Sequence, residues 1–314
     1  MKMKNMTKKI SIAMTTYNGS QYIVELLDSL RQQTRPVQEV IIADDGSTDD
    51  TVSIVEDYIK KYSLKGWNIY TNDKNLGWKR NFKEVISKTT GDYVLLADQD
   101  DVWLTNKVEK LVKCLEETNG WLAVSDFQAV GEKRYTEKAY MPDLNYVKDT
   151  YQVKFTNQFY EILRPGCVMA FTKELKKIFL SLWNDGFAHD ALLWDIAMAA
   201  QKIFYVNQPT IYFRRTGKNA STKMAHDVSE KINNIKLMIK VDEWALNMLQ
   251  LNTESKKTIT DHLKWCKYRK DLIENKKIIN WFNLFRYNRF YVNNKKFLGD
   301  LYYCFKSENT RREL

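Results

Sequence analysis

Residues 93–103 read YVLLADQDDVW, and this stretch decides the fold. The apolar run Tyr93–Ala97 is typical of a strand that is buried on both faces. Asp98, Asp100 and Asp101 follow it directly. Two like charges about 4 Å apart repel by roughly 4 kcal/mol at an effective dielectric of about 20, and a hard divalent cation such as Mg²⁺ or Mn²⁺ removes that cost. The cluster therefore indicates a metal site. The alternative is a solvated loop in which Asp101 caps a following helix, and the pattern alone leaves both open.

The residues before this stretch alternate between strand and helix patterns. Apolar spacing predicts a helix over Gln21–Gln33, a second helix that Ser47 or Thr48 caps, and a third over residues 78–87. The predicted strands are Ile10–Thr16, Glu39–Ala43, Trp67–Tyr70 and Tyr93–Ala97. This alternation predicts an α/β fold with a parallel, doubly wound sheet. Ligands bind at the carboxyl ends of the strands in such sheets, which places Thr15–Tyr17, Asp44–Asp45 and Asp98–Asp101 on one rim.

Beyond residue 103 the pattern is mixed. A helix is predicted over Ala188–Ala200, and the polar, aromatic segment Thr136–Lys154 is expected to be a covering loop. Further strands are predicted at Trp121–Val130, Gly166–Thr172, Ile203–Val206 and Thr210–Phe213. From about residue 225 the pattern becomes helical. We therefore predict two domains, an α/β domain over residues 1–222 and a basic, aromatic-rich helical region over residues 223–314.

The composition, the net charge and the absence of certain motifs disfavour several classes of protein. The 314-residue chain is 44% hydrophobic and 28% charged, which fits a large folded core. Its net charge of +10 fits a phosphorylated substrate or an anionic membrane surface, while the lack of a recognition-helix or RNA-binding signature disfavours nucleic acid. The four Cys residues are far apart, which disfavours a zinc site and fits a reducing compartment. Neither an apolar run of about 18 residues nor a signal-peptide core occurs, so we expect a cytosolic protein.

Three further groups of polar residues are candidates for binding or catalysis. Asp44–Ser47 can present a carboxylate to a base or a ribose hydroxyl, and the alternative is a turn with a helix cap. Asp190 can act as a general base with His189 beside it, and the alternative is again a cap. Arg214 and Arg215 suit a diphosphate or, alternatively, a solvated turn. Since neither GxGxxG nor GxxxxGK[ST] occurs, phosphate binding must use a metal or arginines.

Four motifs together carry a family resemblance: Ala13–Gly19 (AMTTYNG), Asp44–Asp49 (DDGSTD), Asn75–Gly77 (NLG) and Asp98–Trp103 (DQDDVW). In order and spacing they resemble the family-2 glycosyltransferases with the GT-A fold, over about residues 8–220. The segment NLGWKRNF, the DQDDVW run and His189-Asp190 are most similar to the branch that includes bacterial rhamnosyltransferases of surface polysaccharide assembly. The resemblance implies that residues 1–222 are a GT-A (Rossmann-like) nucleotide-diphospho-sugar transferase domain with a C-terminal helical extension.

The resemblance implies a role for each matching residue. The residues implied to bind the donor nucleotide are Thr15, Tyr17, Asp45, Arg80 and Asp98. Asp98 and Asp100 match the DxD motif and would hold Mn²⁺ or Mg²⁺, with Asp100 as the direct ligand. Asp190 matches the catalytic base of this inverting family. The residues implied to contact the diphosphate or the acceptor are His189, Arg214 and Arg215.

The resemblance also implies the reaction. One sugar moves from a UDP- or dTDP-linked donor to a hydroxyl of a glycan or lipid-linked acceptor, with inversion, during capsule or cell-wall polysaccharide biosynthesis. The QxxRW pattern of processive synthases is absent, which favours transfer of a single sugar. Thr216 and Lys218 depart from the family pattern after Arg214 and Arg215, so the role of that loop stays open. The alternatives are a sugar-nucleotide-binding protein without transferase activity and a nucleotidyltransferase, and Thr15–Gly19 disfavours the latter because it lacks a glycine-rich basic loop.

The segment Ile278–Phe305 mixes aromatic residues with Lys and Arg. Basic amphipathic segments of this composition often lie on anionic membranes, and such binding would make the protein peripheral at the inner face of the cell membrane. The alternative is a helical extension that packs on the catalytic domain or on a second subunit of a homodimer. The sequence leaves these possibilities open.

Overall fold

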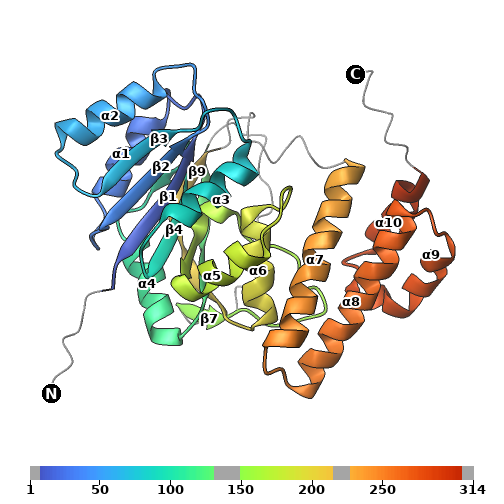
Figure 1. Ribbon diagram of the computed structural model, residues 1–314. Coiled ribbons are helices and arrows are strands. Elements are labelled where there is room, and N and C mark those ends of the chain that lie inside the picture. The colour runs from blue at the N-terminus through green and yellow to red at the C-terminus, as the bar shows by residue number, and fades with distance from the viewer. Residues whose placement is uncertain (1–7, 131–148, 215–226, 306–314) are drawn as a thin grey trace. The chain divides into compact units, whose positions relative to one another are not determined.

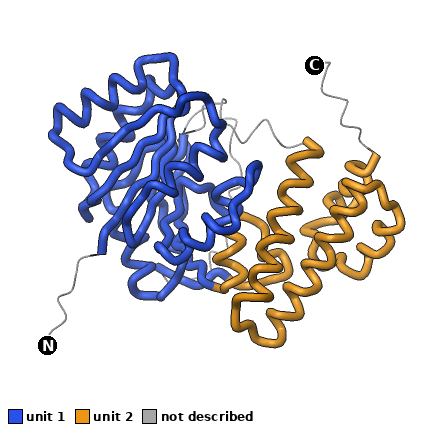
Figure 2. The backbone as a smooth tube through the Cα atoms, viewed as in Figure 1, with its two compact units in different colours: residues 1–153, 163–193, 202–219 blue, residues 154–162, 194–201, 220–314 orange. Residues whose placement is uncertain are grey.

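The computed structural model describes residues 8–130, 149–214 and 227–305. The chain separates into two compact units (Figure 2). Unit 1 comprises residues 1–153, 163–193 and 202–219, and unit 2 comprises residues 154–162, 194–201 and 220–314. The predicted domain boundary near residue 222 lies outside the described residues, so a division at that point stays a prediction.

The first four strands of unit 1 form the parallel arrangement that the sequence predicts (Figure 1). These strands are β1 (Ile10–Thr16), β2 (Glu39–Asp44), β3 (Trp67–Thr71) and β4 (Tyr93–Asp98), in the order β3-β2-β1-β4. The helices between them are α1 (Ile23–Arg31), α2 (Thr51–Lys61) and α3 (Trp78–Lys88). Each helix returns the chain to the end of the sheet where the previous strand began. The strands therefore run in the same direction, and their carboxyl ends lie together.

Strand β1 shows why this half of the sheet forms. Ile10, Ile12 and Met14 alternate along the strand and join a buried cluster that also contains Leu26 and Leu30 of α1. Side chains two residues apart point to the same face of a strand, so one face of β1 packs against this helix. Burial of each such side chain contributes about 1.5–3 kcal/mol. The parallel half is therefore fixed by apolar side chains.

The second half of the sheet is mixed. Its strands are β5 (Val102–Trp103), β6 (Leu122–Val130), β7 (Thr150–Gln152), β8 (Met169–Thr172) and β9 (Ile203–Arg214). Strand β8 lies antiparallel between β4 and β6, while β6 pairs parallel with β9. The helices here are α4 (Lys107–Thr118), α5 (Lys173–Leu182) and α6 (His189–Ala199). The expectation of a parallel sheet therefore holds only for the first four strands.

Three predicted elements in this half differ from the structure. Residues 203–214 form one strand rather than two, because register shifts opposite Asp126 let β9 continue past Pro209. The predicted strand at Gly166–Thr172 begins with a 3₁₀ turn, η1 (Gly166–Val168). Residues 150–152 of the predicted covering loop form β7, and residues 136–148 of that loop lie outside the described residues.

Unit 2 contains the C-terminal helices, as the helical pattern predicts (Figure 1). They are α7 (Val228–Met248), α8 (Thr253–Glu274), α9 (Ile279–Leu284), the 3₁₀ helix η3 (Phe285–Phe290) and α10 (Asn294–Phe305). A buried pair joins α7 to α8, with His262 Nδ1 2.7 Å from Asp242 Oδ2. Arg269 of α8 pairs with the buried Asp300 of α10 at 2.6 Å. Among the described helices, none has the length and apolar character needed to cross a membrane.

Candidate active site

The strand register brings the predicted residues of three motifs to one rim of unit 1. Thr15 of β1 pairs with Asp98 of β4 on one side and with Ala43 of β2 on the other. Thr16 pairs with Asp44. The ends of the three strands are therefore level, so the loops that follow them lie next to one another.

The loop after β1 is held by the side chain of Gln99. Thr16 Oγ1 and the Tyr17 backbone N–H both donate to Gln99 Oε1 at 2.8 Å, and Gln99 Nε2 donates to the Tyr17 carbonyl at 3.0 Å. A Cβ atom on Gly19 would lie 2.3 Å from Gln99 Oε1, so a larger residue there would displace the Gln99 amide from this position. The Tyr17 side chain is 47% exposed at this rim. Sequence reasoning missed Gln99, although its place inside the acidic run was a signal.

Asp45 is buried and holds the turn that carries the NLG motif. Its carboxylate accepts from the backbone N–H groups of Leu76 at 2.8 Å and Gly77 at 2.9 Å, and from Asn72 Nδ2 at 2.9 Å. Gly77 has φ +76°, which favours glycine. The structure thus joins two motifs that lie about 30 residues apart in the sequence. It does not test the predicted contact of Asp45 with a nucleotide base.

The predicted cap of α2 is wrong. The helix begins at Thr51, after the capping position Asp50. Ser47 is engaged elsewhere, because its backbone N–H donates to Asp44 Oδ2 at 2.8 Å. The Thr48 N–H donates to Asn18 Oδ1 at 2.8 Å. Local hydrogen bonds within the turn therefore delay the start of the helix by several residues.

The acidic cluster lies at the end of β4. Asp98, Asp101 and Cys167 each offer one ligand atom, and these atoms lie within 4.8 Å of one another. Asp101 is 1% exposed, and its Oδ1 accepts from the Arg214 backbone N–H at 3.3 Å. Its Oδ2 is buried without a hydrogen-bond partner among the described residues. Strand β5 follows Asp101 and α4 begins only at Lys107, so the predicted helix-capping alternative for Asp101 is wrong.

Burial and mutual repulsion oppose ionisation of the acidic side chains in this cluster. Burial, and then the charges of Asp101, Asp100 and Asp190, raise the pKa of Asp98 well above its usual value. Burial also raises the pKa of Asp100, and burial with the Asp100 charge raises the pKa of Asp101 to about 7. Burial keeps the Cys167 thiol protonated by raising its pKa well above 9. The available donors are thus carboxylate oxygens, which suit Mg²⁺ or Mn²⁺.

A buried lysine lies beneath this cluster. The Lys107 side chain is fully buried, and its Nζ donates to the Cys167 carbonyl and lies 3.4 Å from the centroid of the Trp103 ring. Burial lowers the pKa of Lys107 to about 7, against the opposing influence of Cys167, Asp101 and Asp98. Sequence reasoning missed this residue. Its signal was a lysine that precedes the apolar positions Val108 and Leu111 on one face of α4.

Helix α6 begins at His189, so Asp190 lies in its first turn, as predicted. His189 is 4% exposed and stacks on Phe82 with a centroid separation of 3.9 Å. Burial lowers the pKa of His189 to about 4, so the ring is neutral at pH 7. A Cβ on Gly166 would lie 2.8 Å from His189 Nε2. The ring therefore anchors the start of α6, and the charge of Asp190 lies close enough to raise the pKa of Asp98.

The predicted arginines have different surroundings. Arg80 of α3 forms two hydrogen bonds with the Asp185 carboxylate, one of them from Nε to Oδ1 at 3.1 Å. Arg214 Nη2 lies 2.5 Å from Glu25 Oε2, and its guanidinium lies 4.7 Å from the centroid of the Tyr22 ring. Arg215 lies outside the described residues. The first pair ties α3 to the loop that precedes Asp190.

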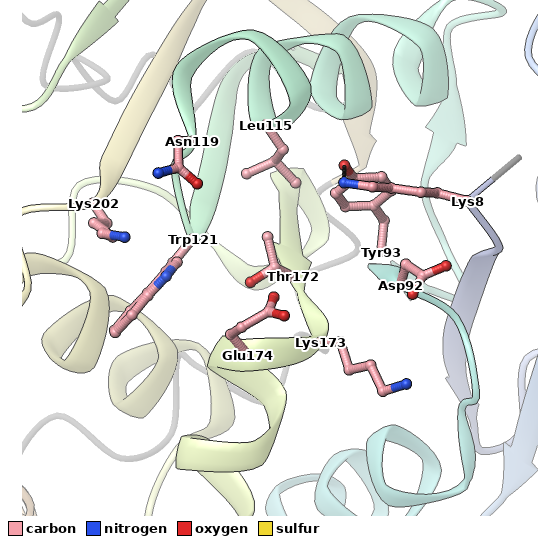
Figure 3. A pocket seen from close by; sticks show the side chains of 11 residues that line it. Lys8, Asp92, Tyr93, Leu115, Asn119, Trp121, Thr172, Lys173, Glu174 and Lys202 are labelled. Atoms are coloured by element: carbon pink, nitrogen blue, oxygen red, sulfur yellow. Dashed lines mark hydrogen bonds between the residues drawn. The ribbon is translucent and has the colours of Figure 1, made fainter. Parts of the chain in front are cut away.

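Figure 3 shows the side chains that line a separate cavity of about 420 Å³. Its lining residues include Asp92, Trp121 and Lys202, which directly precede β4, β6 and β9, and Lys8, which lies two residues before β1. Since β1 and β4 run parallel, the acidic cluster lies at their other end. The cavity is therefore distinct from the candidate active site.

Comparison with known proteins supports the same reading of the fold. Residues 11–179 match the family described as Glycosyl transferase family 2, which is more than half of the chain. The dTDP-rhamnosyl transferase RfbG of Shigella flexneri is 28% identical over 245 residues, which cover 74% of this chain and 80% of RfbG. The poly(ribitol-phosphate) beta-N-acetylglucosaminyltransferase TarS of Staphylococcus aureus is 42% identical over 95 residues, which cover 30% of this chain and only 16% of TarS.

Solved structures show the same fold. The crystal structure of S. aureus TarS 1-349 in complex with UDP-GlcNAc has a TM-score of 0.65 at 19% identity and covers 95% of this chain and 82% of that one. The mannosyltransferase PcManGT from Pyrobaculum calidifontis, in complex with GDP-Man and Mn²⁺, has a TM-score of 0.53 at 16% identity and covers 95% and 85%. These likenesses show the GT-A fold that the sequence predicts. The chain belongs to glycosyl transferase family 2.

Proposed function

We propose that this glycosyltransferase moves one sugar from a UDP- or dTDP-linked donor to a hydroxyl group with inversion, and that it depends on a divalent metal. The observation that carries this proposal is the meeting of four carboxylates at one rim. Asp98 is half-buried and lies within electrostatic reach of Asp100, Asp101 and Asp190. An enzyme that binds a diphosphate through a cation and deprotonates a hydroxyl nearby needs this combination.

Asp98 and Asp100 are the proposed metal ligands. The fit of a cation is supported by the raised pKa of both carboxyls and by the unpartnered buried Oδ2 of Asp101. Asp101 is near enough to Asp98 to share the ion. When bound, Mn²⁺ or Mg²⁺ would supply positive charge against the diphosphate of the leaving nucleotide. Thr15, whose strand position pairs with Asp98, would lie against the nucleotide.

The donor nucleotide would lie on the two loops that the carboxyl ends of β1 and β2 carry. Gln99 fixes the first loop and exposes Tyr17, while Asp45 fixes the second through the turn at Gly77. Arg80 is the proposed contact at the side of the donor, and its pairing with Asp185 would set its position. Arg214 and Arg215 are proposed contacts of the diphosphate or the acceptor.

Asp190 is the proposed general base. Its carboxylate would accept the proton of the acceptor hydroxyl as that oxygen attacks the anomeric carbon from the face opposite the leaving group. The bond to the nucleotide diphosphate breaks, and the configuration inverts. The neutral His189 would act on Asp190 only through position, because its ring is packed against Phe82. No proton transfer by His189 is needed.

The acceptor is proposed to be a glycan or a lipid-linked glycan of cell-surface polysaccharide. The resemblance to a dTDP-rhamnosyl transferase and to an enzyme that acts on poly(ribitol-phosphate) supports this choice. Such an acceptor would place the enzyme in the cytoplasm, at the inner face of the cell membrane. A deoxyhexose or a hexose derivative is the proposed sugar.

The test is turnover of UDP- and dTDP-sugars by the purified chain with Mn²⁺ or Mg²⁺, followed as release of nucleoside diphosphate. We expect Asp190→Asn to lower turnover by about 1,000-fold, the scale of general base catalysis, and to leave donor affinity within about twofold of the parent. Asp57→Asn, which changes an exposed carboxylate of α2, is the matched control.

Three results would contradict this assignment. Near-normal turnover of Asp190→Asn would remove Asp190 from catalysis. Tight donor binding without any transfer or hydrolysis, across acceptors that include surface glycans, would favour a sugar-nucleotide-binding protein. Formation of a nucleotide sugar from a sugar phosphate would favour a nucleotidyltransferase.

A further inference from the structure

The exposed apolar residues of the protein gather in the last helices of unit 2. Among the described residues, 14 large hydrophobic side chains are exposed, and eight of these lie between residues 278 and 305. The eight are Ile278, Ile279, Phe282, Phe285, Val292, Leu298, Tyr302 and Phe305. Scattered single exposed hydrophobic residues need no explanation, whereas a concentration of this kind marks an interaction surface.

Three of these residues share one face of a helix. Ile278, Phe282 and Phe285 are spaced at i, i+4 and i+7, and the backbone is helical from Ile278 through Phe285. Their exposed fractions are 46%, 59% and 54%, and Ile279 beside them is 67% exposed. The rings of Phe282 and Phe285 contact Trp281 with centroid separations of 5.5 and 5.1 Å. The three rings therefore form an aromatic cluster, and the exposed Ile278 and Ile279 lie at the start of the same helix.

Within the described residues, the fold of unit 2 uses this face only in part, because the Phe285 ring contacts Phe297 with a centroid separation of 4.9 Å. The residues that bury the segment are others: Leu284 and Phe290 are fully buried, and Phe297 is 7% exposed. Trp281 stacks on Phe297 with a centroid separation of 5.1 Å and an angle of 22°. The segment is thus both a packed helical extension and a carrier of apolar side chains that remain in water.

The segment that carries the aromatic cluster has an excess of positive charge. Residues 276–305 contain six basic residues, which are Lys276, Lys277, Arg286, Arg289, Lys295 and Lys296. The one acidic residue in this range is Asp300, which is buried and paired with Arg269 at 2.6 Å. All six basic residues are exposed, and three of them form ion pairs, Lys277 with Asp271, Arg289 with Asp261 and Lys296 with Glu161. An apolar face on a segment with excess positive charge matches the headgroup region of an anionic bilayer, where aromatic side chains lie at the interface and Lys or Arg reach the phosphates.

We propose that the surface formed by Ile278, Ile279, Phe282, Phe285 and the basic residues around them binds anionic phospholipid bilayers. This surface would hold the enzyme at a membrane that carries a lipid-linked acceptor. The inference adds a partner to the proposed function, but it rests on unit 2 alone. Binding can be measured without donor, metal or turnover, so its failure is distinguishable from failure of the proposed reaction.

The test is cosedimentation of the full chain with vesicles of phosphatidylcholine, with and without phosphatidylglycerol. We expect binding at least about tenfold stronger to the anionic vesicles, and its loss at about 1 M salt because the Debye length falls to about 3 Å. Ile278→Ser with Ile279→Ser should weaken binding about tenfold. Lys276→Glu with Arg286→Glu should weaken it by at least as much. None of the four substituted residues takes part in the contacts between the aromatic rings of the segment.

Met248→Ser is the control, because Met248 is 71% exposed at the end of α7 and lies outside the surface. It should bind vesicles like the parent chain, and circular dichroism should show all variants folded. Three results would overturn the proposal: no preference of the parent for anionic vesicles, unchanged binding of both double variants, or a dimer of the parent that the same variants dissociate. The last result would assign the surface to a second copy of the chain.

Discussion

At the amino ends of the parallel strands, the buried carboxylate of Glu39 accepts hydrogen bonds from Ser11 Oγ at 2.5 Å, Lys9 Nζ at 2.9 Å and the Thr90 backbone N–H at 2.7 Å. At the carboxyl end of β4, by contrast, one buried oxygen of Asp101 has no hydrogen-bond partner in the part of the chain that the structure describes. Although burial opposes ionisation of both groups, the donors around Glu39 lower its pKa to about 2, while the pKa of Asp101 rises to about 7. The fold thus surrounds the acid that holds strands together with hydrogen-bond donors, whereas it gives fewer donors to Asp101 of the candidate site, where we propose that a cation binds.

Among the changes that test this comparison, the largest expected effect comes from removing a proposed ligand of that cation. Asp98→Asn should lower turnover by about 100- to 1,000-fold, because the lost electrostatic stabilisation of the leaving diphosphate is worth about 3–4 kcal/mol. Initial rates over a series of Mn²⁺ concentrations measure this, and the residual activity should no longer respond to the metal. A variant with normal metal activation would show that Asp98 is not a ligand, and Glu39→Gln serves as the control because it removes a buried carboxylate at the other end of the sheet.

Glu39→Gln should have the opposite pattern, with stability lost and turnover per folded molecule kept. The folded pKa of Glu39 is depressed from 4.5 to about 2, so its contribution to stability is present above about pH 5 and is lost as the pH falls towards 2. At pH 7 we expect the free energy of unfolding to fall by about 2 kcal/mol, after a discount for solvent screening near Lys9. Urea unfolding at pH 7 and pH 3 measures this. An equal loss at both pH values would show that packing, and not the charge, is responsible.

Asp101→Asn should stabilise the metal-free protein while impairing the enzyme. The folded pKa of Asp101 is raised from 3.8 to about 7, so this acid costs no stability below about pH 4, and the cost grows as the pH rises to 7. We expect the variant to gain roughly 1–2 kcal/mol at pH 8 and nothing near pH 4. Thermal unfolding in EDTA at both pH values measures the gain. A variant that is less stable than the parent at pH 8 would show that the folded protein stabilises the ionised carboxylate of Asp101.

The parallel half of the fold could be predicted from sequence because apolar periodicity alone determines it. Ile10, Ile12 and Met14 repeat at the strand period, and the residues after each strand are punctuated by Asp, Gly and Asn. The mixed half could not be predicted as well. Helices α4 and α5 were not predicted, and β9 was split in two at Pro209, because its pairing depends on distant β6 and on register shifts opposite Asp126.

The candidate site divides in the same way. Its acidic residues could be recognised from the sequence, since Asp98, Asp100 and Asp190 lie where strands and helices end or begin. The residues that support them are not visible, because their role depends on partners far along the chain. Lys107 reaches the carbonyl of Cys167 from 60 positions away, and Gln99 reaches Tyr17 from 82. A periodic pattern carries no information about such contacts.

The smallest expected effect concerns Gln99, which holds the loop after β1. The test asks whether Gln99 only supports this loop, as Glu39 supports the strands, or acts on the reacting groups. Gln99 forms three hydrogen bonds to Thr16 and Tyr17, and removing them should cost about 1 kcal/mol of stability, because exposed donors and acceptors regain water. Gln99→Ala should raise the KM for the donor about tenfold with little change in kcat, because the loop is no longer preorganised. Gln99→Glu keeps the acceptor for the Tyr17 N–H and should recover part of the affinity. The contrary outcome is that Gln99→Ala lowers kcat as strongly as Asp98→Asn and leaves the KM unchanged. The Gln99 amide would then act on the reacting groups rather than on the loop, and Gln99 would belong with the reactive residues instead of the supporting ones.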